Sequence, residues 1–247
     1  MNAKIFWLSI IAIVISFIGG FYLANTLNRN ELMAVRGENE RLKKTQADKP
    51  QTDSETNLTD DEIRQKIAEA DKNPNNFVFQ RDLGLALFRY GAMKQDVNLI
   101  SESSRLLQRA FNNNPKDYDV IVTLGNTFYD VAALKKDPAN FIKAREYYLK
   151  ALEQKADDAD VRADYGSTFL FAEPAELDKA FSELQRSLQN DPKNERALKF
   201  ITQTLLKQNK RPEAEKYFVR LKEVNPKAPD LNALNSEISS GNNSNQK

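Results

Sequence analysis

The chain has 247 residues, of which 36 are basic and 35 acidic, and its formal net charge is +1. A nearly neutral chain offers no electrostatic attraction for nucleic acid. It contains no cysteine and no histidine, which excludes disulfides, thiolate nucleophiles and cysteine-based metal sites and removes the commonest general base. We therefore expect no catalytic residues, no cofactor and no metal site, and the chain is predicted not to be an enzyme.

Residues 5–24 are apolar apart from two serines. Twenty helical residues at 1.5 Å each cover the hydrocarbon core of a bilayer, which is roughly 30 Å thick. Trp7 and Tyr22 lie near the two ends, as interfacial aromatic residues do. We predict one transmembrane anchor within residues 1–29. A cleaved signal peptide is the alternative, but its best cleavage site would place the bulky Tyr22 at the −3 position.

Small residues recur at every fourth position of this segment, at Ala12, Ser16, Gly20 and Ala24. They would share one face of a helix, where a second transmembrane helix can approach closely. Such residues are also common in membrane helices that do not associate. A homodimer formed through this face therefore stands as an alternative to a single anchor.

The membrane orientation is not decided by charge. Lys4 favours a cytoplasmic N terminus, whereas five basic residues between positions 29 and 44 favour a cytoplasmic C-terminal side. Because long domains are translocated largely regardless of charge, we expect the N terminus inside. The chain is then a single-pass protein of the cytoplasmic (inner) membrane with a periplasmic domain.

Two short segments are expected to join the anchor to the folded domain. Residues 30–44 are highly charged and carry an apolar pattern of only two heptads, which is too short for a coiled coil and favours a solvated helical stalk. Residues 45–57 are rich in Gln, Asp, Thr, Ser and Lys, which predicts a flexible linker.

The folded domain is predicted to cover residues 58–238. Its first helix is expected to begin at a capping box, in which the side chains of Thr59 and Glu62 each bond the backbone N–H of the other. This helix should run to about Lys72. Residues 239–247 are polar and predict a disordered tail.

Five helix stops, most of them Asn-Pro or Asp-Pro pairs, recur through the domain. The intervals between successive stops are 41, 41, 36 and 34 residues. A period of this length indicates stacked helical units, none of which can bury its own apolar face alone. The stops are Asn73-Pro74, Asn114-Pro115, Lys155-Ala156, Asp191-Pro192 and Asn225-Pro226.

Other positions repeat in the same register. A glycine follows each of the first three stops, with apolar residues one before and three after it, which indicates one face of a helix. A second amphipathic helix precedes each following stop. Small residues are expected where the paired helices cross closely, because a large side chain would overpack the crossing. These residues are Gly84, Ala110, Gly125, Ala144, Ala151, Gly166, Ala180 and Ala214.

This pattern resembles the tetratricopeptide repeat (TPR) family, whose 34-residue motif reads W-x2-L-G-x2-Y, then A-x3-F, A and P. Leu124-Gly125-x2-Phe128 and Ala144-x3-Tyr148 match it in the second unit, and Ala214-x3-Phe218 matches it in the fourth. No unit has the leading Trp, and three of the four spacings exceed the family period. The additional residues are expected to lengthen the turns within units or the helix ends.

The resemblance implies an all-α TPR solenoid of about four helix–turn–helix repeats, preceded by one transmembrane helix and a linker. A capping helix is expected at residues 228–238. The repeats are expected at about 75–115, 116–156, 157–192 and 193–226.

In this family the first helix of each unit lines a concave groove that binds protein or peptide partners, and the resemblance implies such a groove here. Some members clamp a C-terminal carboxylate with basic residues and Asn. Arg81 and Asn126 fit two clamp positions, but Asp160 and Asp164 stand where basic residues are required, which disfavours a clamp. The implied groove residues are Arg81, Leu85, Phe88, Arg89, Val122, Asn126, Tyr129, Asp160, Asp164, Ser167, Phe171, Arg196, Lys199 and Gln203.

Together these features predict a membrane-anchored TPR adaptor that binds protein or peptide partners and organises a complex at the membrane. Aromatic residues beside charged groups suit an extended peptide or a partner helix. A bacterial envelope setting rests on analogy with other anchored TPR proteins. The alternative is a self-assembling structural scaffold that dimerises through the transmembrane helix and the stalk.

Overall fold

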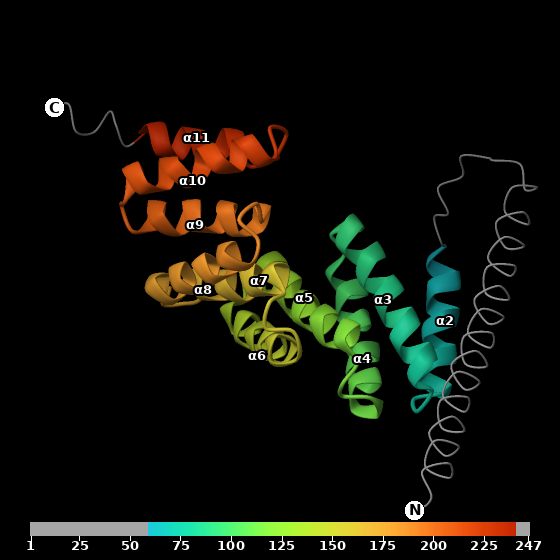
Figure 1. Ribbon diagram of the computed structural model, residues 1–247. Helices are drawn as coiled ribbons and strands as arrows, with labels where there is room; N and C mark the ends of the chain where they lie inside the picture. The colour runs from blue at the N-terminus through green and yellow to red at the C-terminus, as the bar shows by residue number, and fades with distance from the viewer. Residues whose placement is uncertain (1–58, 241–247) are drawn as a thin grey trace, which may run out of the picture. The chain divides into compact units, whose positions relative to one another are not determined.

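The computed structural model describes residues 59–240, and this part of the chain consists of ten helices without strands (Figure 1). Four helix–turn–helix pairs follow one another, with α2 before the first pair and α11 after the last. The predicted all-α repeat architecture is confirmed for these residues. The helices are α2 (Asp60–Lys72), α3 (Phe77–Lys94), α4 (Val97–Asn113), α5 (Tyr118–Lys135), α6 (Pro138–Gln154), α7 (Ala159–Leu170), α8 (Leu177–Asn190), α9 (Glu195–Lys207), α10 (Arg211–Val224) and α11 (Leu231–Ser240).

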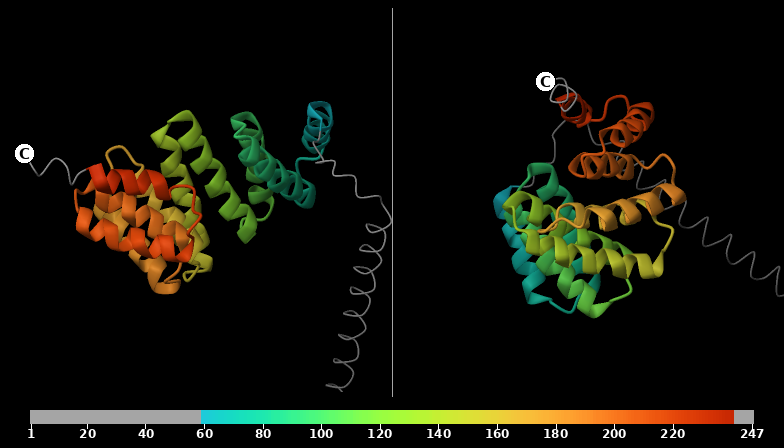
Figure 2. Two further views of the ribbon diagram at one scale, coloured as in Figure 1. Left: turned by 90° about the horizontal axis from the view of Figure 1, so that it is seen from above. Right: turned by 90° about the vertical axis from the view of Figure 1, so that its left-hand side faces the viewer.

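The pairs stack in chain order through contacts between neighbouring helices. Within the four units, α3 packs with α4, α5 with α6, α7 with α8 and α9 with α10. The second helix of each unit also packs against the first helix of the next, so that α4 contacts α5, α6 contacts α7 and α8 contacts α9. Figures 1 and 2 show this succession from α3 to α11. Each unit thereby buries an apolar face that it could not cover alone.

The first helix of the domain begins and ends as predicted. Glu62 Oε2 accepts a hydrogen bond of 2.8 Å from the Thr59 N–H, and the Thr59 hydroxyl oxygen accepts one of 3.3 Å from the Glu62 N–H. These reciprocal bonds satisfy two backbone donors that the helix itself leaves unpaired. Ile63 and Ala70 of α2 are buried, so this helix covers the outer side of the first unit.

The five predicted stops are the positions where helices end. Each first residue of a stop is a helix C-cap, and its backbone N–H donates to a carbonyl of the last turn. In the first four stops, the third residue after the C-cap is the N-cap of the next helix, and its side-chain oxygen accepts from a first-turn N–H. One repeated turn therefore ends a unit and starts the next. The four N-caps are Asn76, Asp117, Asp158 and Asn194.

The residues beyond the 34-residue period are accommodated in two ways. Helices α3 and α5 each have 18 residues, whereas α9, the first helix of the fourth unit, has 13. The two long helices end at Gln95 and Lys136, both in the left-handed region with φ of 53°. In the third unit, residues 171–176 form a loop between α7 and α8. The first two units thus use longer helices, and the third uses a longer turn.

Glycines at the helix crossings leave no room for a side chain. A Cβ atom on Gly84 would lie 2.7 Å from Leu107 Cγ, and one on Gly125 would lie 2.5 Å from Cε1 of the buried Tyr148. Gly166 has a similarly close neighbour on α8. The first and second helices of a unit therefore approach each other through these glycines. The small residues predicted in the second helices are all completely buried, namely Ala110, Ala144, Ala151, Ala180 and Ala214.

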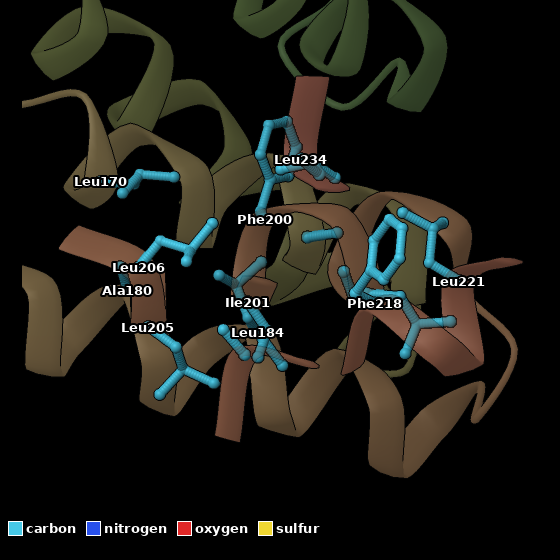
Figure 3. Packing of buried hydrophobic residues seen from close by; sticks show 14 of the residues in the cluster. Leu170, Ala180, Leu184, Phe200, Ile201, Leu205, Leu206, Phe218, Leu221 and Leu234 are labelled. Carbon is cyan, nitrogen blue, oxygen red and sulfur yellow. The ribbon is translucent and has the colours of Figure 1, made fainter. Parts of the chain in front are cut away.

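The largest cluster of buried apolar side chains lies in the C-terminal half of the domain, between α7 and α11 (Figure 3). Leu170 of α7, Leu184 of α8 and Ile201 of α9 are completely buried. Phe218 of α10 and Leu234 of α11 extend the cluster to the last helix. Smaller clusters hold the first two units together. The core is therefore distributed along the stack, with every helix from α2 to α11 contributing buried residues.

Three predicted segments lie outside the described residues, namely the anchor within 1–29, the stalk at 30–44 and the linker at 45–57. Among the helices of residues 59–240, none combines the length and apolar character needed to cross a bilayer. The helix after the last repeat is Leu231–Ser240 rather than 228–238, so it takes in the first two residues of the predicted tail. The rest of that tail also lies outside the described range.

Candidate partner-binding groove

A pocket of about 450 Å³ lies on the surface formed by the first helices of the units. Its walls come from α3, α5, α7 and α9 and from Asp158, the N-cap of α7, and no second helix of a unit contributes. The pocket therefore opens on the surface that the family resemblance assigns to a partner. We call it the acidic pocket because of its charged lining.

Four aspartates line the acidic pocket, against Arg89 and Arg196. Arg196 is engaged with one of the four, since its Nη1 lies 2.7 Å from Asp164 Oδ2. Once this ion pair is set aside, three aspartates and one basic residue, Arg89, remain in the lining. The other three aspartates are Asp119, Asp158 and Asp160.

Two of these carboxylates are held in place by uncharged donors. The Tyr118 hydroxyl donates to Asp158 over 2.7 Å, and the Asn194 side-chain amide donates to Asp160 over 2.8 Å. A neutral donor orients a carboxylate without cancelling its charge, and an ionised carboxylate keeps further acceptor capacity. Within residues 59–240, these and other acidic side chains do not form a group of three that could hold a metal ion. The pocket thus presents fixed acceptors to a ligand.

Burial raises the pKa of one carboxyl group that lines the acidic pocket and of a second carboxyl group close to it. Desolvation raises the pKa of Asp164 to about 7 and the pKa of the neighbouring Asp130 to about 6, and the positive charge of Arg196 opposes both shifts. A low-dielectric site disfavours the charged form of a carboxyl group. The Asp164 charge in turn is the main cause that raises the pKa of the Arg196 guanidinium. The pocket therefore becomes more negative as the pH rises through neutrality.

The raised pKa of Asp164 predicts a specific pH dependence of stability. Because the folded-state pKa of about 7 lies above the ordinary value of 3.8, the stabilisation from the neutral carboxyl group is present at low pH and is lost as the pH rises through 7. Asp164→Asn removes this titration. We expect its free energy of unfolding, relative to wild type, to increase between pH 5 and pH 8 in urea titrations.

The control for this prediction is Asp157→Asn, because Asp157 is exposed in the turn before α7. This substitution also removes one carboxylate, so it reproduces any general effect of net charge. We expect its stability relative to wild type to change little over the same pH range. A constant difference between Asp164→Asn and wild type at all pH values would contradict the assignment.

A second pocket, of about 380 Å³, lies further along α5. Its aromatic lining consists of Tyr129 from α5, Phe141 from α6 and Phe171, the C-cap of α7. The ring centroids of Tyr129 and Phe141 are 5.1 Å apart, and those of Phe141 and Phe171 are 5.7 Å apart, which are distances typical of attractive aromatic pairs. Phe200 of α9 packs edge-on against Phe171 at 5.9 Å. We call this site the aromatic pocket.

Most of the groove residues implied by the family resemblance line one of the two pockets. The lining of the aromatic pocket includes Tyr129 and Phe171. The lining of the acidic pocket includes Leu85, Phe88, Arg89, Val122, Asn126, Asp160, Asp164 and Arg196.

Four of the implied groove residues line neither pocket. Arg81 pairs with Asp82 and Asp117, Lys199 Nζ lies 2.7 Å from Asp230 Oδ2, and Gln203 is half-buried. Ser167 does not fit the prediction, because it is completely buried and its hydroxyl donates to the Asp164 carbonyl over 2.7 Å. The repeat register placed Ser167 correctly on α7, but its short side chain is covered by the packing of neighbouring helices.

Several lining residues were not among those implied by the repeat register. Phe141 and Pro138 belong to α6, a second helix, and Glu173 lies in the loop after α7. They reach the aromatic pocket because the start of α6 and that loop lie near the C-terminal end of α5. Tyr118 and Asp119, in contrast, lie on a first helix one and two turns before Val122 and Asn126. The helical period alone could have found these two.

Comparisons with known proteins support the repeat fold. The family model described as tetratricopeptide repeat matches residues 172–238. Among solved structures, MamA is 20% identical with a TM-score of 0.52, covering 67% of this chain and 82% of that chain. MamA from Desulfovibrio magneticus RS-1 is 12% identical with a TM-score of 0.54, covering 68% and 86%.

A thermophilic TPR protein of Thermus thermophilus is 14% identical with a TM-score of 0.52, covering 64% of this chain and 82% of that chain. No curated protein sequence matches the chain. At these identities the structural likeness concerns the fold alone. The described residues therefore form a TPR solenoid, and the part of it from α8 to α11 also matches the family model.

Proposed function

We propose that this chain, whose residues 59–240 have the TPR fold, is a membrane-anchored adaptor that binds a segment of a partner protein in the groove formed by its first helices. The observation that carries the proposal is the presence of two pockets along α5, one acidic and one aromatic. Pockets that combine aromatic walls with a few oriented polar groups are typical of recognition sites. In this groove, the carboxylates of Asp158 and Asp160 are oriented by the uncharged donors of Tyr118 and Asn194 and can accept hydrogen bonds from a ligand.

The anchor is the second part of the proposal. Residues 5–24 have the length and apolar composition of a membrane span, and the polar segment 45–57 would tether the repeat domain to it. We propose a single-pass protein of the inner membrane with the repeats on the periplasmic side. Tethering raises the effective concentration of the groove near membrane partners.

A cross-linking experiment tests the adaptor proposal in the native membrane. Because the chain has no cysteine, a single cysteine can be placed at Ala133, which is exposed and lines the aromatic pocket. A photoreactive maleimide is attached to it, and the cross-linked proteins are identified by mass spectrometry. We expect one dominant partner protein from this position.

Ala233→Cys is the matched control, because Ala233 is exposed on α11 and lines neither pocket. The partner should be absent from cross-links at this position. Equal cross-linking from both positions, or none from Ala133→Cys, would show that the groove is not a partner site and would end the adaptor proposal.

A scaffold is the second candidate, and the stripe of small residues at Ala12, Ser16, Gly20 and Ala24 favours it. In this case the chain would assemble with copies of itself through residues 1–57. Deleting those residues distinguishes the two functions. An adaptor fragment still captures the partner, whereas a scaffold loses its oligomers and captures nothing.

A further inference from the structure

The acidic and aromatic pockets lie along one face of α5. Val122 and Asn126 line the first, and Tyr129 and Ala133 line the second. Residues at spacings of three and four share one face of a helix. A single extended ligand that follows this face therefore meets the acidic pocket and then the aromatic pocket.

The acidic pocket is chemically suited to a cation. Asp119 is exposed, while Asp158 and Asp160 are each oriented by an uncharged donor. Arg196 is engaged by Asp164, so Arg89 is the remaining basic group in the lining. A carboxylate ligand would be placed beside several aspartates and repelled, whereas a guanidinium or ammonium group would find several acceptors.

The aromatic pocket is suited to a large apolar side chain. Tyr129, Phe141 and Phe171 stand around it with their rings in contact with one another. An aromatic or long aliphatic group entering the pocket would bury its area against these rings. The exposed Ala133 leaves the entrance unobstructed, since its side chain is a single methyl group.

The spacing of the two pockets sets the spacing of the two ligand groups. The α5 residues of the acidic pocket are centred near Val122 and those of the aromatic pocket near Ala132. Ten helical residues rise by about 15 Å. An extended peptide covers that distance with roughly four to five residues.

Resting on the proposed function of the groove, we propose that the partner segment is an extended peptide carrying an Arg or Lys and a large apolar residue roughly four to five positions apart. The basic side chain binds among Asp119, Asp158 and Asp160. The apolar side chain enters the aromatic pocket. Charge complementarity selects the partner, and the aromatic pocket supplies most of the buried area.

The test measures binding of short fluorescein-labelled peptides to the full-length chain in detergent by fluorescence anisotropy. The probe peptide carries one Arg and one Trp separated by four residues in a Gly/Ser background, made in both sequence orders. We expect one order to bind, and to bind about tenfold more tightly than versions with Glu for Arg or Ser for Trp, a ratio that corresponds to about 1.4 kcal/mol. Affinity should be highest at this spacing in a series with shorter and longer separations.

Variants of the chain assign each half of the peptide to its pocket. Combining Asp119→Asn with Asp160→Asn should weaken binding of the Arg peptide about tenfold. The control combines Glu146→Gln with Glu153→Gln, an equal charge change on exposed residues of α6, and should leave binding unchanged.

The aromatic pocket is tested separately. Ala133→Trp fills this pocket and should abolish the tighter binding of the Trp peptide over the Ser peptide. Ala233→Trp, on α11, should leave it intact. Circular dichroism melts verify that each variant is folded.

Three outcomes would overturn this proposal. The first is tighter binding of the Glu peptide than of the Arg peptide. The second is absence of binding by every peptide in the series. The third is a cross-link from position 133 to residues 1–58 of the same polypeptide, which would mean that the chain fills its own groove. The second outcome leaves the adaptor proposal intact if position 133 still cross-links to a partner protein. Failure of both experiments rejects the groove as a binding site.

Discussion

The Gly125→Leu variant is expected to melt about 6–12 °C below the wild-type protein, through a loss of about 3 kcal/mol. Any Cβ at this position would lie 2.5 Å from Cε1 of Tyr148. Tyr148 is 1% exposed, and its hydroxyl donates a hydrogen bond of 2.9 Å to Asn126 Oδ1. Burial and this hydrogen bond together prevent the ring from moving away from an added side chain. Leu has a higher helix propensity than Gly, but this offsets only about 1 kcal/mol of the lost stability.

Thermal unfolding followed by circular dichroism measures this effect. Ala133→Leu is the control, because it adds a similar side chain at an exposed position of the same helix. We expect that variant to stay within about 0.5 kcal/mol of wild type. An unchanged melting temperature for Gly125→Leu would mean that α5 and α6 do not cross at this glycine.

The second large effect is expected for Leu184→Ala, which should lower the free energy of unfolding by about 2–5 kcal/mol. Leu184 is completely buried in the largest apolar cluster, which also contains Ala180, Ile201 and Phe218 (Figure 3). Truncation removes buried methyl groups and leaves a cavity that neighbouring helices fill only in part. Gln185→Ala, at the exposed neighbouring position on α8, is the control and should change stability little.

A double-mutant cycle ties this loss to the helix crossing. A Cβ on Gly166 would lie 2.9 Å from Cγ and 3.1 Å from Cδ2 of Leu184, and 3.2 Å from its backbone nitrogen, so most of the strain of Gly166→Ala comes from the leucine side chain. In the Leu184→Ala background the contacts with the leucine side chain are gone, and the added methyl group improves helix propensity. We expect the double variant to be about 1 kcal/mol more stable than the sum of the single changes predicts. Strict additivity in urea titrations would contradict the contact.

The repeat positions were predictable because each obeys a local rule. Asn114 and Asn225 end helices through a backbone N–H that donates to a carbonyl of the last turn, and their side-chain oxygens accept from the N–H two residues further on. Gly84 and Gly125 stood out because their spacing equals the repeat period. The helix after the last repeat was placed less well, since its start at Leu231 follows a turn whose packing involves the buried Ala228.

The groove was predictable only in part. Leu85, Val122 and Asn126 line the acidic pocket, as the resemblance to the repeat family implied for groove residues. Phe141 could not be assigned in this way, because it belongs to a second helix and enters the aromatic pocket from α6. Ser167 fell on the expected helix but was covered by the packing around it. The exposure of a side chain depends on which helices pack around it, and residues nearby in the sequence do not reveal this.

The raised pKa of Asp164 is another property that depends on packing rather than on local sequence. In the sequence it is one of several acidic residues between positions 157 and 164, and burial, rather than its neighbours along the chain, is the main cause of its raised pKa. Its burial, and its 2.7 Å contact with Arg196 of the next unit, arise only when α7 and α9 come together. Whether a carboxyl group is desolvated depends on what packs over it.

Capping residues, glycine positions and apolar periodicity were enough to predict a stack of helical hairpins, because each of them acts over a few residues at a time. The absence of cysteine and histidine chemistry also follows from the amino-acid composition alone. Which side chains share a pocket, which are covered, and how the acidic and aromatic pockets follow one another along α5 became apparent only from the folded chain. Those properties depend on distances between residues that are remote in the chain, and packing alone sets such distances.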